Sequence, residues 1–253
     1  MKICLAAVLC VGLVLGTIVP ARAYTAQQQQ ELQIGQQEYQ QLSSQGKIVT
    51  SSPYYAILNP IARRISQVAN AKYFMPFRFI LIKDSSPNAF AVPGGNVYVT
   101  TAMMTFAKNQ EELAGVLCHE TSHDIHHDVV NLNPRYQTIG TVGGILSVLI
   151  GNNRTAQSLL GAAASADADQ FSRQIESNAD HLGAYTCAQS GYNPWGMVWL
   201  MQRFQKSDTG GSMEFLSDHP RDDHRVSDLE TEFRNDPATF SRFSSSIANG
   251  HRL

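Results

Sequence analysis

Helical periodicity dominates the order of apolar and polar residues in this 253-residue chain. Apolar residues that recur three or four positions apart predict amphipathic helices. The predicted helices cover residues 55–71, 194–204 and about 222–233, and a further helix begins after Asn109 and includes residues 119–123. Residues 24–46 carry a similar apolar face, although the glutamine run at 27–30 within them is expected to be disordered.

Three short stretches have the composition of β-strands. Residues 78–83 contain the run Phe79-Ile80-Leu81-Ile82, while residues 90–92 and 96–100 flank Pro93-Gly94-Gly95. Because Pro-Gly-Gly favours a turn, the second and third strands are expected to form a hairpin. Three short strands followed by helices predict an α+β fold that is mostly helical and has a small three-stranded sheet.

Residues 1–23 have the pattern of a secretory signal peptide. Lys2 gives a positive start, residues 3–19 are an uninterrupted apolar run, and Ala21-Arg22-Ala23 is an A-x-A cleavage site. We therefore expect residues 24–253 to form one exported domain, which is periplasmic or secreted. Because the apolar run is slightly long for a signal peptide, an uncleaved membrane anchor is the alternative.

Charge and composition narrow the classes of partner. Without Lys2 and Arg22 the chain keeps 17 basic and 21 acidic residues, a net charge of −4. With no basic cluster, nucleic acid is excluded as an expected partner. Residues 139–150 are apolar, uncharged and too short to span a bilayer, so they predict a buried or interfacial helix, with peripheral membrane contact left open. The polar residues after about 237 predict a loose tail.

The stretch His119-Glu120-Thr121-Ser122-His123 carries the most specific chemistry. Residues four apart lie on one face of a helix, and at 100° per residue the two histidines are about 40° apart in projection. Two imidazoles so placed can bind one zinc ion, with the glutamate beside a zinc-bound water. Zinc lowers the pKa of that water towards about 7, and the carboxylate takes its proton. One zinc ion per chain is therefore expected.

A third protein ligand has two candidates. His126 lies on the same helical stripe, but about 10 Å along the axis from His119, which is too far for a straight helix. A metzincin site is excluded, because the tenth position after His119 is Val129 and no glycine intervenes. Glu176 is the better candidate, since Asp180 follows it by four residues and can orient a ligand histidine. A solvent-exposed pair of acidic residues is the alternative.

Two cysteines lie outside the signal-like segment, Cys118 and Cys187. An oxidising compartment would permit a disulfide between them. However, both lie within apolar helical patterns, and two helices that meet at a metal ion would hold these sulfur atoms apart. We therefore expect two buried thiols.

Several motifs occur in one order along residues 33–229. They are Asn88-Ala89-Phe90-Ala91-Val92-Pro93-Gly94-Gly95, Leu113-Ala114-Gly115-Val116-Leu117 leading into the histidine motif, Glu176-Ser177-Asn178-Ala179-Asp180, Gly191-Tyr192-Asn193-Pro194, and His219-Pro220 with Arg225. In this order the chain resembles the HtpX-like and BepA-like zinc metallopeptidases, gluzincin relatives of the CaaX prenyl proteases. The resemblance implies a zincin-like metalloprotease domain whose sheet lies beside the metal-binding helix.

The resemblance also implies roles for the metal-site residues. His119, His123 and Glu176 would be the zinc ligands, and Glu120 would be the catalytic base. Family members commonly have a histidine where this chain has Asp128. That departure leaves the end of the metal helix uncertain without affecting the ligands.

By the same resemblance, the strand before the Pro-Gly-Gly turn would lie along the substrate cleft. An exposed strand edge can hold an extended peptide through backbone hydrogen bonds. The expected contacts are Asn88, Ala89, Phe90 and Ala91. For Phe90, packing within the sheet is an equal alternative.

His219 and Arg225 are expected to face the zinc cleft, and His219 has two alternative roles. As an electrophile it would stabilise the oxyanion of the tetrahedral intermediate, which is the role we favour. As a resting fourth ligand, its neutral imidazole would keep the enzyme closed. Arg225 is a candidate oxyanion donor, with a surface ion pair to Asp222 or Asp228 as the alternative.

The leading functional hypothesis is a zinc-dependent endopeptidase that cleaves misfolded or unassembled envelope proteins, so that its partners are polypeptides. The alternative is a self-inhibited, chaperone-like protein that binds extended polypeptides in a zinc cleft with little cleavage. A purely structural zinc module is disfavoured, because closed structural sites are built from four Cys or His ligands and would leave Glu120 without a role.

Overall fold

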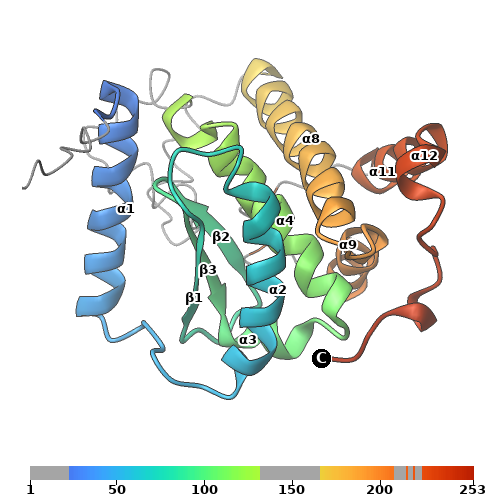
Figure 1. The fold of residues 1–253 in the computed structure, drawn as a ribbon, viewed down its shortest axis with the longest axis horizontal. Coiled ribbons are helices and arrows are strands. Elements are labelled where there is room, and N and C mark those ends of the chain that lie inside the picture. Colours follow the sequence, from blue (N-terminus) through green and yellow to red (C-terminus); the bar gives the residue numbers. More distant parts are fainter. Residues whose placement is uncertain (1–22, 132–165, 208–214, 216–218, 220–223) are drawn as a thin grey trace, which may run out of the picture.

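A small mixed sheet lies between helix α1 on one side and the other helices on the opposite side (Figure 1). The structure is a computed structural model that describes residues 23–131, 166–207, 215, 219 and 224–253. The expectations for a signal peptide and for the apolar segment 139–150 fall outside the described residues. In the described part of the chain, no helix has the length and apolar character needed to cross a membrane.

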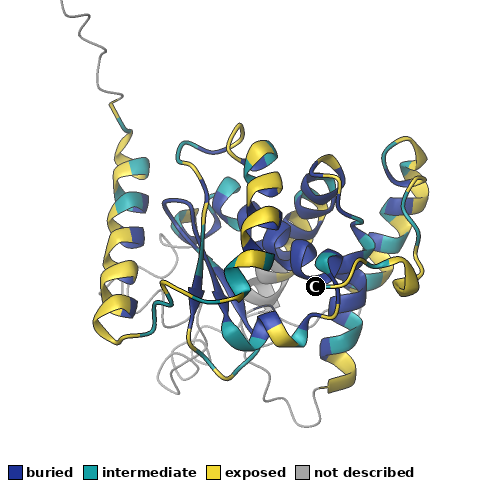
Figure 2. Ribbon diagram, turned by 60° about the horizontal axis from the view of Figure 1, so that its bottom comes forward, coloured by how far each residue is buried: buried dark blue, intermediate teal, exposed yellow. Residues whose placement is uncertain are grey.

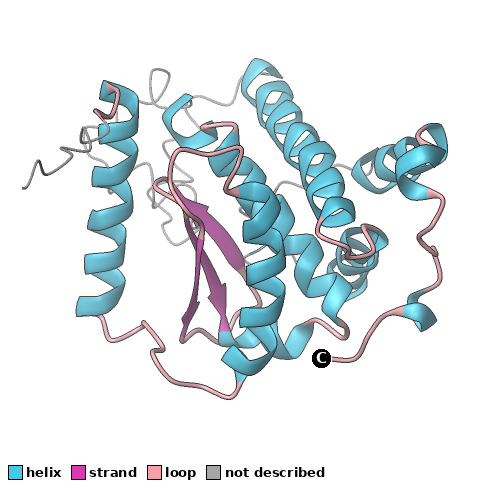
Figure 3. Cartoon of the chain, viewed as in Figure 1, coloured by secondary structure: helices cyan, strands magenta, loops and turns pink. Residues whose placement is uncertain are grey.

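Helices make up most of the described chain (Figure 3). They are α1 (Ala26–Ser44), α2 (Tyr54–Ala69), α3 (Thr101–Phe106), α4 (Gln110–Ile125), α8 (Ala166–Gln189), α9 (Trp195–Ser207), α11 (His224–Asn235), α12 (Pro237–Phe240) and the 3₁₀ helix η2 (Ile247–Asn249). The three strands are β1 (Arg78–Ile82), β2 (Ala89–Val92) and β3 (Asn96–Thr100). The α+β prediction is therefore confirmed.

The sheet has the strand order β1-β3-β2. β2 and β3 pair antiparallel, so that the predicted hairpin is present, and β1 pairs parallel with β3. Gly94 and Gly95 in the turn have φ of 96° and 84°, a left-handed backbone that favours glycine. Because β3 is central, β2 is left at an edge of the sheet.

Helix α1 begins before the point that composition predicts. The glutamine run 27–30 is helical, so the expected disordered leader is wrong for these residues. The reason is a capping box, in which Gln28 N donates to the Thr25 hydroxyl and Thr25 N donates to the Gln28 side chain. The inner face of α1 is buried and its outer face is exposed (Figure 2).

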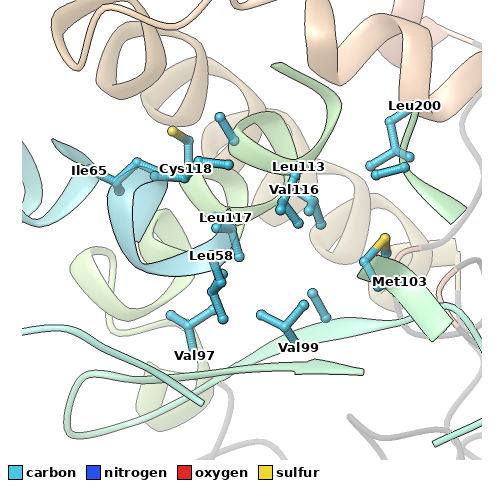
Figure 4. Packing of buried hydrophobic residues seen from close by; sticks show 14 of the residues in the cluster. Leu58, Ile65, Val97, Val99, Met103, Leu113, Val116, Leu117, Cys118 and Leu200 are labelled. Carbon is cyan, nitrogen blue, oxygen red and sulfur yellow. The ribbon is translucent and has the colours of Figure 1, made fainter. Parts of the chain in front are cut away.

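The main core lies between the sheet and helices α2, α4, α8 and α9. Leu58 and Ile65 of α2 meet Val97 and Val99 of β3 and Leu117 of α4 there (Figure 4). All five side chains are fully buried. A smaller core, built around Ile34, Phe90 and Tyr98, fills the space between α1 and the other face of the sheet.

Helix α4 packs closely against both α8 and α9 at glycines. An added Cβ atom on Gly183 of α8 would lie 3.1 Å from the Cα atom of His119, and one on Gly196 would lie 2.0 Å from the carbonyl oxygen of Glu111. Cys118 and Cys187 are buried free thiols, as expected. Burial, and then the Cys187 thiol, raise the pKa of the Cys118 thiol.

The polar end of the chain, expected to be loose, is instead anchored. It contains α12 and η2, and the Trp199 indole donates to Ser245 O at 2.9 Å. Gln110 N, at the start of α4, donates to His251 O at 2.8 Å. Polar composition predicts an exposed segment. It cannot predict that the backbone oxygens of Ser245 and His251 accept hydrogen bonds from α9 and α4.

We predict that Gly196→Ala lowers the free energy of unfolding by about 1–3 kcal/mol, the usual cost of overpacking. The new methyl group would meet a backbone atom of α4, which cannot move without shifting the whole helix. Urea unfolding measures the effect. The control is Gln205→Ala, an exposed position on the same helix, which should change stability by less than about 0.5 kcal/mol. Equal stabilities for the two variants would contradict this account of the contact.

Candidate metal centre

Four side chains from separate parts of the chain meet between α4 and α8. His119 and His123 come from α4, Glu176 comes from α8, and His219 lies between α9 and α11 in sequence. One ligand atom from each of the four lies within 4.8 Å of the others. His126, the other candidate for third ligand, caps the end of α4 and is not in this group.

The distances within this group match the size of a tetrahedral zinc site. His119 Nε2 lies 3.1 Å from His123 Nε2 and 3.2 Å from His219 Nδ1. The Glu176 carboxylate lies 3.1 Å from His219 Nδ1, 3.4 Å from His119 Nε2 and 3.7 Å from His123 Nε2. Ligand atoms about 2.0–2.1 Å from a tetrahedral zinc ion are about 3.3 Å from one another. The residues present therefore fit a zinc ion.

Each metal-helix histidine has a carboxylate at its second ring nitrogen. His119 Nδ1 lies 2.9 Å from Asp180 Oδ1, so the expected partner is in place. His123 Nδ1 lies 2.8 Å from Asp128 Oδ2, a contact that the sequence reasoning did not identify. A carboxylate in this position fixes the tautomer and the ring orientation of a ligand histidine.

Asp128 reaches His123 because the chain turns sharply after α4. The helix ends at Ile125, and His127 follows with φ of 57°, a left-handed conformation that is uncommon for histidine. This turn brings Asp128 back towards the helix. One signal was present in the sequence, since Asp128 stands where family members commonly have a histidine. The contact of Asp128 with His123 could not be predicted from it, because that contact depends on the turn.

Arg225 lies behind the ligands rather than on the surface. Its Nε and Nη2 atoms each donate to the Asp180 carboxylate at 2.7 Å, and Nη1 lies 2.8 Å from Glu176 Oε2. The residue is buried. Through its bidentate pair, Arg225 holds the Asp180 carboxylate in place beside His119. The sequence suggested only an oxyanion donor or a surface ion pair for Arg225, and neither describes this contact.

These contacts decide the charge of the buried acids. Burial alone would raise the pKa of the Glu176 carboxyl, but His219 and then Arg225 outweigh it and hold that pKa well below its usual value. Burial likewise opposes ionisation of Asp180, and the Arg225 guanidinium lowers the pKa of that carboxyl. Both acids are therefore ionised beside the histidines, which favours a bound cation.

Glu120 lies between the metal group and the sheet. Its Oε2 atom accepts a hydrogen bond from Ala91 N at 2.9 Å, and Oε1 lies 3.2 Å from His219 Nε2. Burial opposes its ionisation, but the charges of His219, His119 and His123 lower the pKa of the Glu120 carboxyl. A carboxylate in this place can accept a proton from a group at the metal.

His219 is buried and packs its ring against Phe215, with ring centroids 4.6 Å apart. Nδ1 faces Glu176 and His119, while Nε2 faces Glu120. Burial would lower the pKa of His219, but the Glu176 and Glu120 carboxylates raise it well above its usual value. Its ring therefore bridges the metal group and the carboxylate beside it.

The predicted substrate strand lies next to this group. Because Ala91 N points to Glu120, Ala91 and Ala89 direct their backbone groups away from β3, while Asn88 and Phe90 direct theirs towards it. Asn88 O accepts from Thr100 N of β3, as this alternation requires. The backbone of Ala89 and Ala91 thus forms the edge of β2 nearest the metal group.

The side chains of this strand have different surroundings. Asn88, Ala89 and Phe90 are buried, and Ala91 is partly exposed. The Phe90 ring stacks on Tyr98 with centroids 5.2 Å apart, on the face of the sheet covered by α1. Its side chain therefore packs within the sheet, in agreement with the second of the two roles expected for it.

Comparison with known proteins gives relatives in bacteria and mitochondria. The chain is 27% identical over 209 residues to the beta-barrel assembly-enhancing protease of Escherichia coli K12, and 29% identical over 210 residues to that of Yersinia pestis. It is 28% identical over 225 residues to the mitochondrial metalloendopeptidase OMA1 of Saccharomyces cerevisiae. Each alignment covers 79% of this chain.

The chain spans less than half of the bacterial relatives, 43%, and 62% of the yeast protein. The similarity therefore concerns only part of each of those proteins. The sequence profile of peptidase family M48 matches residues 56–233, a range that includes the whole metal group, the strand beside it and Arg225. The chain therefore belongs to peptidase family M48.

Proposed function

We propose that the protein is a zinc-dependent endopeptidase that cleaves extended polypeptides bound along β2. The observation that carries the proposal is the convergence of His119, His123 and Glu176 beside Glu120 and an edge strand. Two histidines and one glutamate are a typical ligand set of catalytic zinc. A bound zinc ion would supply Lewis-acid chemistry, because it polarises a carbonyl group and lowers the pKa of water.

Glu120 is the proposed general base. Its carboxylate is held by Ala91 N on one side, so it cannot turn away from the strand that would bind the substrate. It accepts the proton of the attacking water and passes it to the leaving amine. His119 and His123 keep their orientation through Asp180 and Asp128, which leaves their Nε2 atoms to the metal.

The proposed substrates are misfolded or unassembled envelope proteins. An edge strand recognises the backbone of an unfolded segment, and so has little dependence on side chains. The name of the bacterial relatives, beta-barrel assembly-enhancing protease, supports substrates of this class. An exported, periplasmic or secreted location is part of the same proposal, and it rests on the signal-like pattern of residues 1–23.

We further propose that His219 is a resting ligand, in place of the electrophile that the sequence favours. Nδ1 lies among the ligand atoms, and Nε2 lies beside Glu120, so a neutral ring, with a bound metal ion in place of its Nδ1 proton, would take the fourth position and also engage the base. In this arrangement the enzyme is self-inhibited until His219 moves. The same geometry supports the alternative of a protein that binds polypeptides with little cleavage, and activity measurements separate the two.

Glu120→Gln should abolish cleavage while zinc stays bound. No ligand changes, but the proton acceptor is lost, so cleavage of unfolded casein should fall at least about 10²–10⁴-fold. Metal analysis and a casein assay, with a chelator as the reference for no activity, measure both effects. A variant that keeps more than about a tenth of the wild-type activity would falsify the role of Glu120.

Glu176→Ala should lose the metal, because two histidines alone bind zinc weakly. Asp180→Asn and Asp128→Asn should be milder, with zinc affinity about 10–100-fold lower, as is usual for residues that orient ligands. Competition with a chromogenic chelator gives the affinities. A zinc content near one per chain in Glu176→Ala would mean that another residue is the third ligand.

His219→Ala should raise basal casein cleavage and admit small chelating inhibitors faster, because the fourth position and Glu120 are both released. Zinc content should stay unchanged, since three ligands remain. Steady-state cleavage and the rate of inactivation by a chelator test this.

The opposite result has a definite meaning as well. A loss of turnover of about 10²–10³-fold with zinc retained would identify His219 as an oxyanion donor, and would reject the resting-ligand role.

A further inference from the structure

Side chains from two other parts of the chain hold the turn between β2 and β3. Gly94 N donates to the Tyr73 hydroxyl at 3.0 Å, and Gly95 N donates to Asp124 Oδ2 at 3.0 Å. All of these hydrogen bonds are buried. The two turn amides thus depend on a residue that follows α2 and on a residue of the metal helix α4.

The Tyr73 hydroxyl is itself fixed by α1. The hydroxyl donates a hydrogen bond to Glu31 Oε2 at 2.5 Å and accepts one from Gly94 N. Glu31 is almost fully buried, and its other oxygen lies 2.6 Å from His127 Nδ1. A buried carboxylate is costly without such partners. The path Glu31–Tyr73–Gly94 therefore connects α1 to the turn.

The backbone of α1 also presses on the same turn. A Cβ atom on Gly35 would lie 2.3 Å from Pro93 O, so only glycine fits at this point of the helix. The α carbon of Gly94 faces Glu31 O, which an added Cβ would approach to 3.4 Å. Helix α1 and the turn are thus in direct contact in addition to the hydrogen bonds.

The metal helix holds the second half of β2 and the turn that follows it. Glu120 accepts from Ala91 N, and Asp124, one helical turn later, accepts from Gly95 N. Two carboxylates four residues apart on one helix therefore set the position of the strand along α4. This position decides which backbone groups of β2 lie beside the catalytic base.

We propose that Tyr73, bonded to Glu31 of α1, is a positioning residue for substrate binding. It acts by holding the turn and so keeping the edge of β2 in register with Glu120. The inference rests on the proposed function, because it takes β2 as the strand that binds the polypeptide. Tyr73 contacts neither the metal ligands nor Glu120, so its effect is on peptide affinity and not on metal binding.

The chain offers a matched control at the opposite edge of the same sheet. The Tyr55 hydroxyl donates to Val49 O at 2.7 Å and accepts from Leu81 N of β1 at 3.2 Å. Tyr55→Phe therefore also removes a hydroxyl that donates one hydrogen bond and accepts another. This hydroxyl contacts β1, which β3 separates from β2. Glu31→Gln is the conservative variant, since its amide oxygen can still accept from Tyr73.

The experiment measures binding of a fluorescein-labelled casein peptide to zinc-loaded Glu120→Gln protein, which does not cleave it. Adding Tyr73→Phe should raise the Kd on the order of tenfold, because Gly94 N loses its buried acceptor. Adding Tyr55→Phe should change the Kd by less than about twofold, and Glu31→Gln should give an intermediate value. Zinc content should be the same in all variants.

Hydrogen exchange on the same proteins gives a second readout. Tyr73→Phe should speed exchange in residues 88–96 and leave 78–82 unchanged, and Tyr55→Phe should do the reverse. Unchanged peptide affinity and unchanged exchange at 88–96 in Tyr73→Phe would overturn the proposal. Failure of the Glu120→Gln parent to bind any peptide would instead reject the proposed function, and the exchange result alone would then decide the positioning role.

Discussion

The close approach of α8 to α4 at Gly183 is the contact on which the metal group depends. A side chain there would meet the backbone of His119 at 3.1 Å, so any larger residue would move the helices apart. Glu176 and Asp180 lie on the same side of α8, about two turns and one turn before that glycine. Their distances to the α4 histidines are therefore set by backbone packing.

Such close packing puts charge where water cannot reach it. Glu120, Glu176 and Asp180 are all buried, and burying a carboxylate without partners costs several kcal/mol. Arg225 offsets part of this cost through its bidentate pair with Asp180. The remaining negative charge faces His219 and the other histidines, which explains why the same place favours a cation.

The sheet adds the second half of the site. Because β3 pairs on both sides, β2 keeps one free edge in the described sheet, and Ala91 N turns that edge towards Glu120. This edge of β2 and the metal helix are therefore joined by the hydrogen bond between Ala91 and Glu120. Helix α1 reaches the turn after β2 through Tyr73, so a helix far from the metal group in sequence helps to position this strand.

Sequence alone was enough wherever the relevant geometry is local. The pairing of His119 with His123 follows from helical spacing, and the hairpin at 93–95 follows from turn chemistry. Glu176 needed the four-residue spacing to Asp180 together with a resemblance to a family. The early start of α1 was missed, because a capping box at Thr25 and Gln28 outweighs the polar composition of the glutamine run.

Only the tertiary structure decided the contacts between distant segments. Asp128 meets His123 because of a left-handed residue after the helix, and Arg225 meets Asp180 because α11 packs beside α8. Tyr73 had no signal of its own in the sequence. Helix periodicity and turn propensity depend on residues that are close together in the sequence. The contacts of Arg225 and Tyr73 depend instead on how the helices and the sheet pack in space.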